Sequence, residues 1–561
     1  MISAIMMSNL VIFDNEKFLC LANIYERAEN IYVKERALVG WVFSVSPHGN
    51  YLTHEVCEKL NNLLLDKEIQ AELQDMQKQI FFCMDAEADA DIMQKNVFSK
   101  FTSNKAKRII DLSNDIFDET GVEDIIHPEK EEEEVEKMEE GIQQMIQMEK
   151  AGSDIYFDGF SKMKSFAFFH VLSNWFVPFY KENPALHGLV EALDGSDKLL
   201  EGIEKNSPFC DSDKYSFAYA LTMTLKSPTA APVKEMLKEG LIFANDSAMR
   251  NGIGYTTYVR RMYLQDLYRF FRISHFREAF INIFSTEFFL VSPAFSDRLM
   301  PGSLKSDSQQ YPPISKNIMR FLVKRKNYVR LRTLFTKMGI SSHDVEGLYA
   351  QTLTFFHSRD VMSRFDSIAY ANILFREAPE NPAVLNLVAK VYFVGEEYYL
   401  ALGAYKDLYQ LKPSYKIKLK MAYCLMEMDK SREAVKLLYE LDYNYPNHLD
   451  ILRPLAWGLV LRRDAEKAIP IYNKVMRLLK DKGEKPTVED YFNQGIAYWC
   501  TDDKESASDS FCHIADIKKD FGAILSNNEA KHLVLYDIGL KDIALMGDMV
   551  LQKLKSRDGI K

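Results

Sequence analysis

The last third of the chain repeats one pattern of small and large residues four times. A small residue recurs in the first predicted helix of each unit, and an alanine recurs in the second. Large residues follow both positions, three places after the first and four places after the second. The steps between units are 33, 34 and 39 residues in every column. The columns are Ala389, Ala422, Ala456 and Gly495; Ala401, Ala434, Ala468 and Ala507; Tyr405, Leu438, Tyr472 and Phe511; and Tyr392, Leu425, Leu459 and Tyr498.

This pattern predicts a stack of antiparallel helix pairs. Two helices approach closely only where their side chains are small, and large residues one turn away fill the space on either side. One such pair cannot bury its apolar face alone, so neighbouring pairs must stack into an α-solenoid. The 39-residue step places the extra residues at 481–487. Pro413 and Pro446 end two of the units, because proline cannot continue a helix.

On these residues, 382–521 resembles a tetratricopeptide repeat (TPR) array, and the resemblance covers about a quarter of the chain. It implies an all-α helical-repeat solenoid whose first helices line a concave surface that binds a peptide. Residues 350–381 and 525–555 are expected to add flanking or capping helices. Lys480 and Lys519 stand where the family has proline. Pro470 lies inside a second helix and predicts a local kink.

Projecting the first helices outward from the alanine columns predicts the residues that line this surface. Aromatic and basic residues dominate it, and such residues often carry binding energy. The segment 412–420 has four lysines and no acid, which favours an acidic or carboxylate-bearing peptide. The candidate residues are Asn386, Lys390, Phe393, Lys416, Lys420, Tyr423, Arg453, Trp457, Phe492 and Trp499, with Leu419, Met426, Val460, Asn493 and Ile496 beside them.

The alternative for these residues is structural: the aromatics pack against the next repeat and the lysines are simply solvated. The members of the family that clamp a C-terminal carboxylate need lysine, asparagine and arginine at set columns. Asn386 followed by Lys390 reverses the first pair, and the later columns do not match. The sequence therefore does not predict that clamp.

The rest of the chain also has helical periodicity and little glycine or proline. We expect an N-terminal helical unit at 1–125, an acidic connector at 126–142, a middle helical region at 143–349 and the array with capping helices at 350–561. The stretch 127–141 holds eight glutamates against two lysines, which is typical of a solvated segment. The apolar residues from Val56 to Ile80 predict one long helix, with Thr53 as its cap.

Three further stretches predict helices in the middle region. Residues 258–284 and 317–339 each have the pattern of a helix pair, and the sequence leaves open whether these are divergent repeats. Residues 163–184 are rich in aromatics, and a helix packed into the core is favoured over a ligand pocket there.

Composition argues against several classes of function, with nucleic-acid binding by a local basic groove kept as the least favoured reading. The net charge of −10 opposes nucleic-acid binding. No apolar run is long enough for a membrane span, and the first basic residue is Lys17, so no secretory signal is expected. The seven cysteines form no CxxC motif, which favours reduced thiols and a cytoplasmic protein.

No known catalytic motif is present. The chain lacks a phosphate-binding GxxxxGK[ST], HExxH and GxSxG, and the glycines at 251–258 predict a turn. Cys500, Cys512 and His513 lack a fourth zinc ligand. We therefore expect no catalytic residue, cofactor or metal, and a non-catalytic protein-interaction module acting as scaffold, adaptor or chaperone. The alternative is a small-molecule binder or enzyme that uses 160–290, with the repeats as a docking arm. The oligomeric state is left open.

Overall fold

The computed structural model describes residues 1–48, 51–93, 143, 146–149, 151–227, 231–238, 254–285, 289–299, 313–338, 344–358, 360–517 and 538–557. Every regular element within these ranges is helical, and none of their helices is both long and apolar enough to cross a membrane. The chain divides into two compact units, Met1–Gly339 and Ile340–Lys561. The expected acidic connector, 126–142, lies outside the described residues, and the finer domain boundaries stay a prediction.

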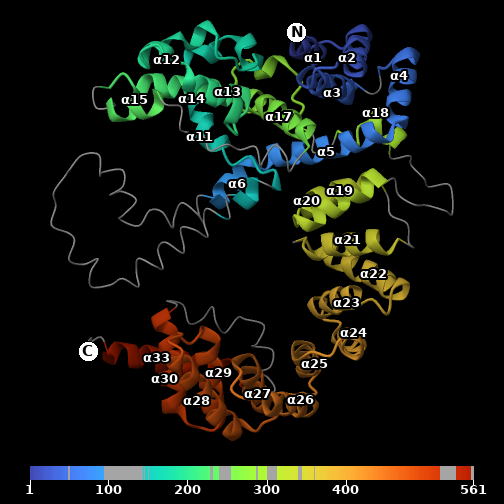
Figure 1. Cartoon of the computed structure of the whole chain (residues 1–561). Coiled ribbons are helices and arrows are strands. Elements are labelled where there is room, and N and C mark those ends of the chain that lie inside the picture. Colours follow the sequence, from blue (N-terminus) through green and yellow to red (C-terminus); the bar gives the residue numbers. More distant parts are fainter. Residues whose placement is uncertain are drawn as a thin grey trace. The chain divides into compact units, whose positions relative to one another are not determined.

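The first unit is built around one long buried helix, α17 (Tyr255–Ile273), which contacts α3, α5 and α14 (Figure 1). Leu264, Leu267 and Phe270 of α17 lie in the core. The other α-helices of this unit are α1 (Ile2–Asn9), α2 (Asn15–Arg27), α3 (Ile31–Val45), α4 (His54–Leu65), α5 (Lys67–Met84), α6 (Ala86–Met93), α11 (Phe157–Ser161), α12 (His187–Ala192), α13 (Lys198–Asn206), α14 (Asp211–Thr224), α15 (Ala231–Lys238), α18 (Pro293–Leu299), α19 (Pro313–Lys324) and α20 (Tyr328–Met338).

Three expectations for the first unit need correction. The predicted long helix is two helices, because Asp66 is extended and its carboxylate accepts a hydrogen bond of 2.7 Å from the Glu68 amide, which starts α5. The second helix expected within 258–284 does not form. After α17 only a short 3-10 turn follows, and the Ile281 amide then donates to the Leu10 carbonyl at 3.0 Å. A tertiary hydrogen bond thus holds this segment outside a helix.

The aromatic stretch at 163–184 folds as short 3-10 helices, Lys162–Ser165, Ala167–His170 and Leu172–Phe176, where one α-helix was expected. Its role in the core is confirmed, since Phe169, Trp175 and Phe179 are buried. The pair expected at 317–339 is present as α19 and α20, and Thr53 caps α4 as expected.

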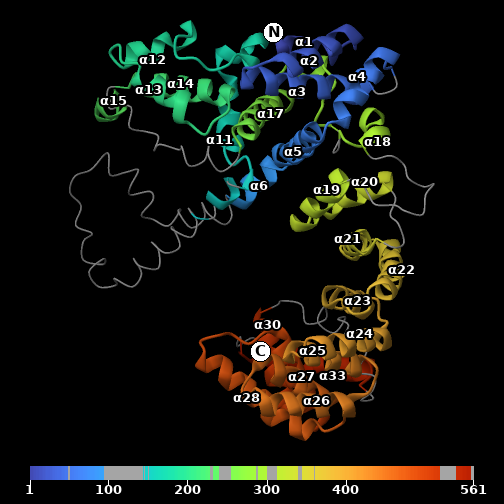
Figure 2. The ribbon, with the colours of Figure 1, turned by 45° about the vertical axis from the view of Figure 1, so that its right-hand side comes forward.

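The second unit is a series of helix pairs. One continuous hydrophobic core runs through it, from Leu348 to Val550, and Figure 1 and Figure 2 show the helices following one another in chain order from yellow to red. The helices are α21 (Val345–Phe356), α22 (Val361–Glu377), α23 (Pro382–Val394), α24 (Tyr398–Leu411), α25 (Tyr415–Glu427), α26 (Ser431–Asn444), α27 (Leu449–Leu461), α28 (Ala465–Asp481), α29 (Val488–Cys500), α30 (Lys504–Ile517) and α33 (Leu540–Arg557).

The repeat columns pack as the sequence predicts. All eight small residues of the two columns are buried, and the approach is closest at Gly495, where a Cβ would lie 2.4 Å from the Phe511 ring. The flanking helices are α21 and α22 before the array and α33 after it, and α33 packs on α30. α28 continues as a helix through Pro470.

The turn inside each repeat shows a regularity that sequence reasoning missed. The second residue after each first helix adopts a left-handed backbone, at Glu396, Asp429, Arg463 and Asp502, with φ between 59° and 66°. These positions keep the steps of 33, 34 and 39 residues, so the turn has one geometry in all four units. None of them is glycine, the usual residue for this conformation, and so the column is not visible in the sequence.

The first helices of several neighbouring units contact one another directly. α21 contacts α23, α25 contacts α27, and α27 contacts α29, whereas the neighbouring second helices contact one another less extensively. That these helices line a concave surface stays a prediction.

Candidate partner-binding surface of the repeat array

Three lysines gather on the first helices of the first two repeats. Lys416 and Lys420 lie one turn apart on α25, and Lys390 projects from α23 close enough to act on Lys420. We call Lys390, Lys416 and Lys420 the lysine triad. Burial lowers the pKa of Lys420, and the positive charges of Lys390 and Lys416 lower it further. Its ammonium group lies 5.6 Å from the centre of the Tyr405 ring.

Within the described part of the chain, no member of the lysine triad has an acidic partner. The contrast is with Lys418, between two members of the triad, whose ammonium group lies 2.5 Å from Glu440. Like charges that are close together and unpaired repel one another, and an anion placed between them would relieve this repulsion. The triad is therefore a site of attraction for a negatively charged group.

Aromatic side chains continue the surface from the lysine triad. Tyr423 lies one turn after Lys420 and is 38% exposed, and Trp457 is half-buried at the corresponding position of α27. Asn386 lies one turn before Lys390 and is half-buried. Phe393 is half-buried against Tyr398, with ring centres 5.4 Å apart. Basic and aromatic residues thus lie on the first helices of the first three repeats.

Arg453, in the third repeat, is engaged inside the array. Its guanidinium donates two hydrogen bonds of 2.7 Å to the Asp490 carboxylate. Asp490 also caps α29 by accepting from the Thr487 amide at 2.9 Å. The contact with Asp490 raises the pKa of Arg453. Arg453 therefore joins α27 to α29, and its charge is already compensated.

The fourth repeat offers little surface at the positions named from the sequence. Phe492 is 3% exposed and packs near Phe511, and Trp499 is 6% exposed beneath the Lys504 ammonium group. The physical reason lies in the columns. Residues one place after the small-residue column project outward in the early repeats, whereas those four places after it turn toward the core. Buried members of the candidate set are Met426, Val460, Phe492, Ile496 and Trp499; Leu419 and Asn493 are half-buried.

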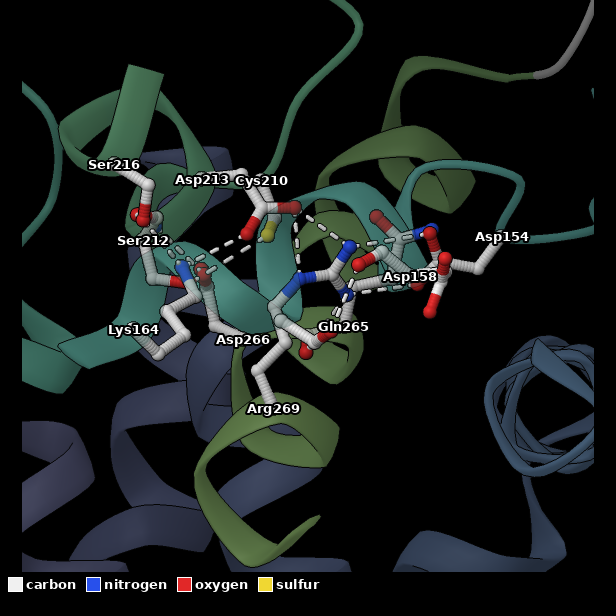
Figure 3. A network of polar contacts seen from close by, with 11 residues as sticks. Asp154, Asp158, Lys164, Cys210, Ser212, Asp213, Ser216, Gln265, Asp266 and Arg269 are labelled. Atoms are coloured by element: carbon white, nitrogen blue, oxygen red, sulfur yellow. Dashed lines mark hydrogen bonds and ion pairs between the residues drawn. The ribbon is translucent and has the colours of Figure 1, made fainter. Parts of the chain in front are cut away.

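The middle region was the alternative site, and its chemistry-bearing groups are enclosed. The Arg269 guanidinium lies between Asp154 and Asp213, with contacts of 2.7 Å and 2.6 Å (Figure 3). Lys164 contacts Asp213 at 2.8 Å and donates to Ser212 at 2.9 Å. All five side chains are buried. A lysine beside a serine could act as a nucleophile pair, but this one has no exposure through which a substrate could reach it.

The charges of this network hold three segments together. Burial alone would raise the pKa of Asp213, but Arg269 and Lys164 outweigh it and lower that pKa below its ordinary value. Mutual compensation of this kind is what a buried charge needs. A pocket of about 1140 Å³ lies nearby, between α6, α11 and the end of α17, and its Arg272 is paired with Glu87 at 2.6 Å. Neither feature favours the alternative function.

No family model and no curated protein matches the chain. Solved structures that are similar include MamA (41-end) from Desulfovibrio magneticus RS-1, at 14% identity and a TM-score of 0.26 over 37% of this chain and 94% of that one. YrrB, described as a TPR protein with an unusual peptide-binding site, is 14% identical over 30% of this chain and 86% of its own, with a TM-score of 0.25. Yeast Tom70 is 14% identical over 90% of this chain and 96% of its own, with a TM-score of 0.25. The C-terminal array is TPR-like in its own columns and packing.

Proposed function

We propose that this chain is a non-catalytic protein-interaction module whose array binds a peptide segment on its concave side. The observation that supports this most is the lysine triad, three ammonium groups without an acidic partner in the described residues, beside the exposed Tyr423 and the half-buried Trp457. Exposed aromatics and cations are the side chains that most often anchor a partner. An enzyme would need an accessible reactive group, and the enclosed network of the middle region does not supply one.

The partner segment carries carboxylates next to an apolar side chain. Its carboxylates lie at the lysine triad, where they relieve the repulsion that lowers the pKa of Lys420. Its apolar side chain packs on Tyr423 and Trp457 of the neighbouring first helices. Arg453 takes no direct part, because Asp490 already occupies its guanidinium. The protein acts as a scaffold, adaptor or chaperone in the cytoplasm.

The test is a titration of the full chain with a short fluorescein-labelled peptide of alternating glutamate and leucine pairs, followed by anisotropy. We expect Lys390→Glu/Lys420→Glu to weaken binding by about tenfold or more, because two attractive contacts become repulsive. A peptide with lysine in place of glutamate should not bind. The matched control, Lys406→Glu/Lys467→Glu, changes the net charge equally on second helices. Equal binding by the triad variant and this control would refute the proposed surface.

A further inference from the structure

The outer face of α26 carries a second cluster of unpaired cations and exposed aromatics. Arg432, Lys436, Tyr439 and Tyr443 follow one another at steps of four, three and four residues, so they form one stripe along the helix. We call these four residues the α26 stripe. The opposite face of α26, with Ala434, Leu438 and Leu441, is buried in the core. The stripe therefore points away from the core of the array, on a helix other than those that carry the lysine triad.

The side chains of the α26 stripe are exposed, and none of them forms a hydrogen bond or an ion pair within the described residues, although the charge of Lys436 acts on the nearby Glu440. Tyr439 is 43% exposed and Tyr443 is 88% exposed. Arg432 and Lys436 are exposed and form no ion pair there, since the nearby Glu440 is bound to Lys418 at 2.5 Å. With Val435, Glu440, Asn444 and Arg462, the stripe lines an open pocket of about 790 Å³. Two cations and two aromatic faces thus border one hollow, and its one carboxylate, Glu440, is bound to Lys418.

The repeat fold does not require this composition. At the repeat position of Arg432, α28 carries Glu466 and α30 carries Glu505, so both of these helices have an acidic residue there. On α24 the position of Lys436 is taken by Gly403, beside which a Cβ would meet open space. The stripe is therefore a property of one repeat, which is what a local binding site would produce.

We infer that the α26 stripe is a second docking site, which binds an acidic peptide segment of another protein with an apolar residue beside its carboxylates. Charge complementarity selects the partner: its carboxylates lie at Arg432 and Lys436, near the N-terminal end of α26. The partner's apolar residue then packs on Tyr439 and Tyr443, toward the C-terminal end. A long polyanion such as single-stranded RNA is disfavoured, because it gains its affinity from many cation contacts and the stripe supplies two.

This inference goes beyond recognition on the concave side, because it gives the array two faces that bind independently. The first helices would hold one segment and α26 another, so one chain could bridge two proteins. That arrangement suits a scaffold or adaptor and is not needed by a chaperone that holds a single client. The two sites share the chemistry of their ligands and differ in position, which allows them to be separated by mutation.

The experiment measures the stoichiometry of the full chain with the same glutamate–leucine peptide by isothermal titration calorimetry. We expect two equivalents to bind the wild type, one to bind Arg432→Glu/Lys436→Glu and one to bind Lys390→Glu/Lys420→Glu. Tyr443→Ala should weaken the α26 site by about tenfold with the fold intact, because this side chain is so exposed. Lys406→Glu/Lys467→Glu should bind two equivalents, as the wild type does.

Each other outcome decides against at least one of the two proposals. If the wild type binds one equivalent, and only the lysine-triad variant loses it, the α26 site is refuted and the concave site stands. If only Arg432→Glu/Lys436→Glu loses it, the concave site is refuted. Binding of a uridine oligonucleotide more tightly than the peptide, or dimerisation in sedimentation that the stripe variant abolishes, would replace the peptide as the occupant of the stripe. No binding at millimolar peptide overturns both proposals.

Discussion

The guanidinium of Arg453 and the carboxylate of Asp490 form a two-point contact between α27 and α29, each hydrogen bond 2.7 Å long. Asp490 is buried, and it also accepts from the amide of Thr487 at the start of α29. The Asp490 carboxylate therefore links the third repeat to the fourth and also caps α29. Its removal affects both functions at once.

We predict that Asp490→Ala destabilises the array by about 1–3 kcal/mol, the cost of losing a cap and a charge-assisted contact. Asp490→Asn should cost less, because the amide oxygen can still accept from Thr487. Urea unfolding of the full chain, followed by circular dichroism, measures both. Glu489→Ala, the exposed neighbour, is the control and should change little. Equal stability of Asp490→Ala and this control would contradict the assignment.

Two glycines of the array are expected to respond oppositely to the same change. Gly495→Ala should destabilise by about 1–3 kcal/mol, because the new methyl group would overlap the buried Phe511 ring. Gly403→Ala should stabilise by about 0.5–1 kcal/mol, because its methyl group meets open space and alanine favours a helix. Thermal and urea unfolding compare the two. Stabilisation of Gly495→Ala as well as Gly403→Ala would show that the close approach at Gly495 is absent.

The buried network of the first unit predicts a larger effect. Arg269→Met leaves Asp154 and Asp213 buried without their shared cation, and loss of one partner of a buried pair typically costs about 3–5 kcal/mol. The exposed Lys162→Met is the matched control. Tryptophan fluorescence during urea unfolding can follow the change, since Trp175 lies in this core. An unchanged midpoint for Arg269→Met would mean that the network contributes no stability.

Asp266 predicts a dependence of stability on pH. Burial raises its pKa to about 6, and the negative charge of Asp211 adds to this, against the opposing effects of the Ser212 amide, Arg36 and Cys210. The ordinary value is 3.8. Between about pH 4 and pH 6 the folded state thus holds a proton that the unfolded state has released, so this group lowers stability as pH rises through that window.

An asparagine at position 266 does not titrate, so Asp266→Asn abolishes this contribution to the pH dependence of stability. The variant should therefore gain stability relative to wild type as pH rises from about 4 to about 6, and the gain should be constant above that. Urea midpoints across this range measure the difference, with Asp91→Asn, an exposed aspartate, as the control. A difference that is the same at pH 4 and pH 7 would rule out the raised pKa of Asp266.

Repulsion within the lysine triad can be measured at Lys420. Its pKa is lowered by burial and then by Lys390 and Lys416, so Lys390→Ala should raise it part of the way back. An amine with a lower pKa is acylated faster near neutral pH, and mass spectrometry can follow this at Lys420. We expect slower acylation in Lys390→Ala and no change in Lys467→Ala. Unchanged acylation in both variants would show that Lys390 lies too far from Lys420 to act on it.

The sequence predicts the array well because its signal is local and repeated. Small residues such as Ala389 and Ala401 have one role in every unit, and their spacing reports the period directly. The candidate surface is harder to predict, since residues one place and four places after the column look alike in sequence. Tyr423 and Trp499 are both aromatic residues on first helices, yet Tyr423 projects outward and Trp499 packs inward.

The first unit has no repeated pattern. Its sequence periodicity predicts the helices wrongly at places where a single hydrogen bond determines whether a helix forms or ends. Ile281 has helical surroundings in sequence, but its amide pairs with Leu10, which is far away in the chain. The apolar pattern around Asp66 is continuous, but one capping hydrogen bond divides it. In this unit, helix type and length are set by such individual partners.

By itself, the sequence determined that the chain is helical, that its C-terminal part stacks pairs of helices at a period near 34 residues, and which small residues bring each pair together. These follow from periodicity and side-chain size, which are properties of neighbours along the chain. Only the tertiary structure decided which basic side chains form an ion pair within the array and which do not. Lys420 and Arg453 look equivalent in sequence, but Asp490 lies within reach of Arg453, and no described acid pairs with Lys420. Compensation of charge depends on distances through space, and sequence spacing does not contain them.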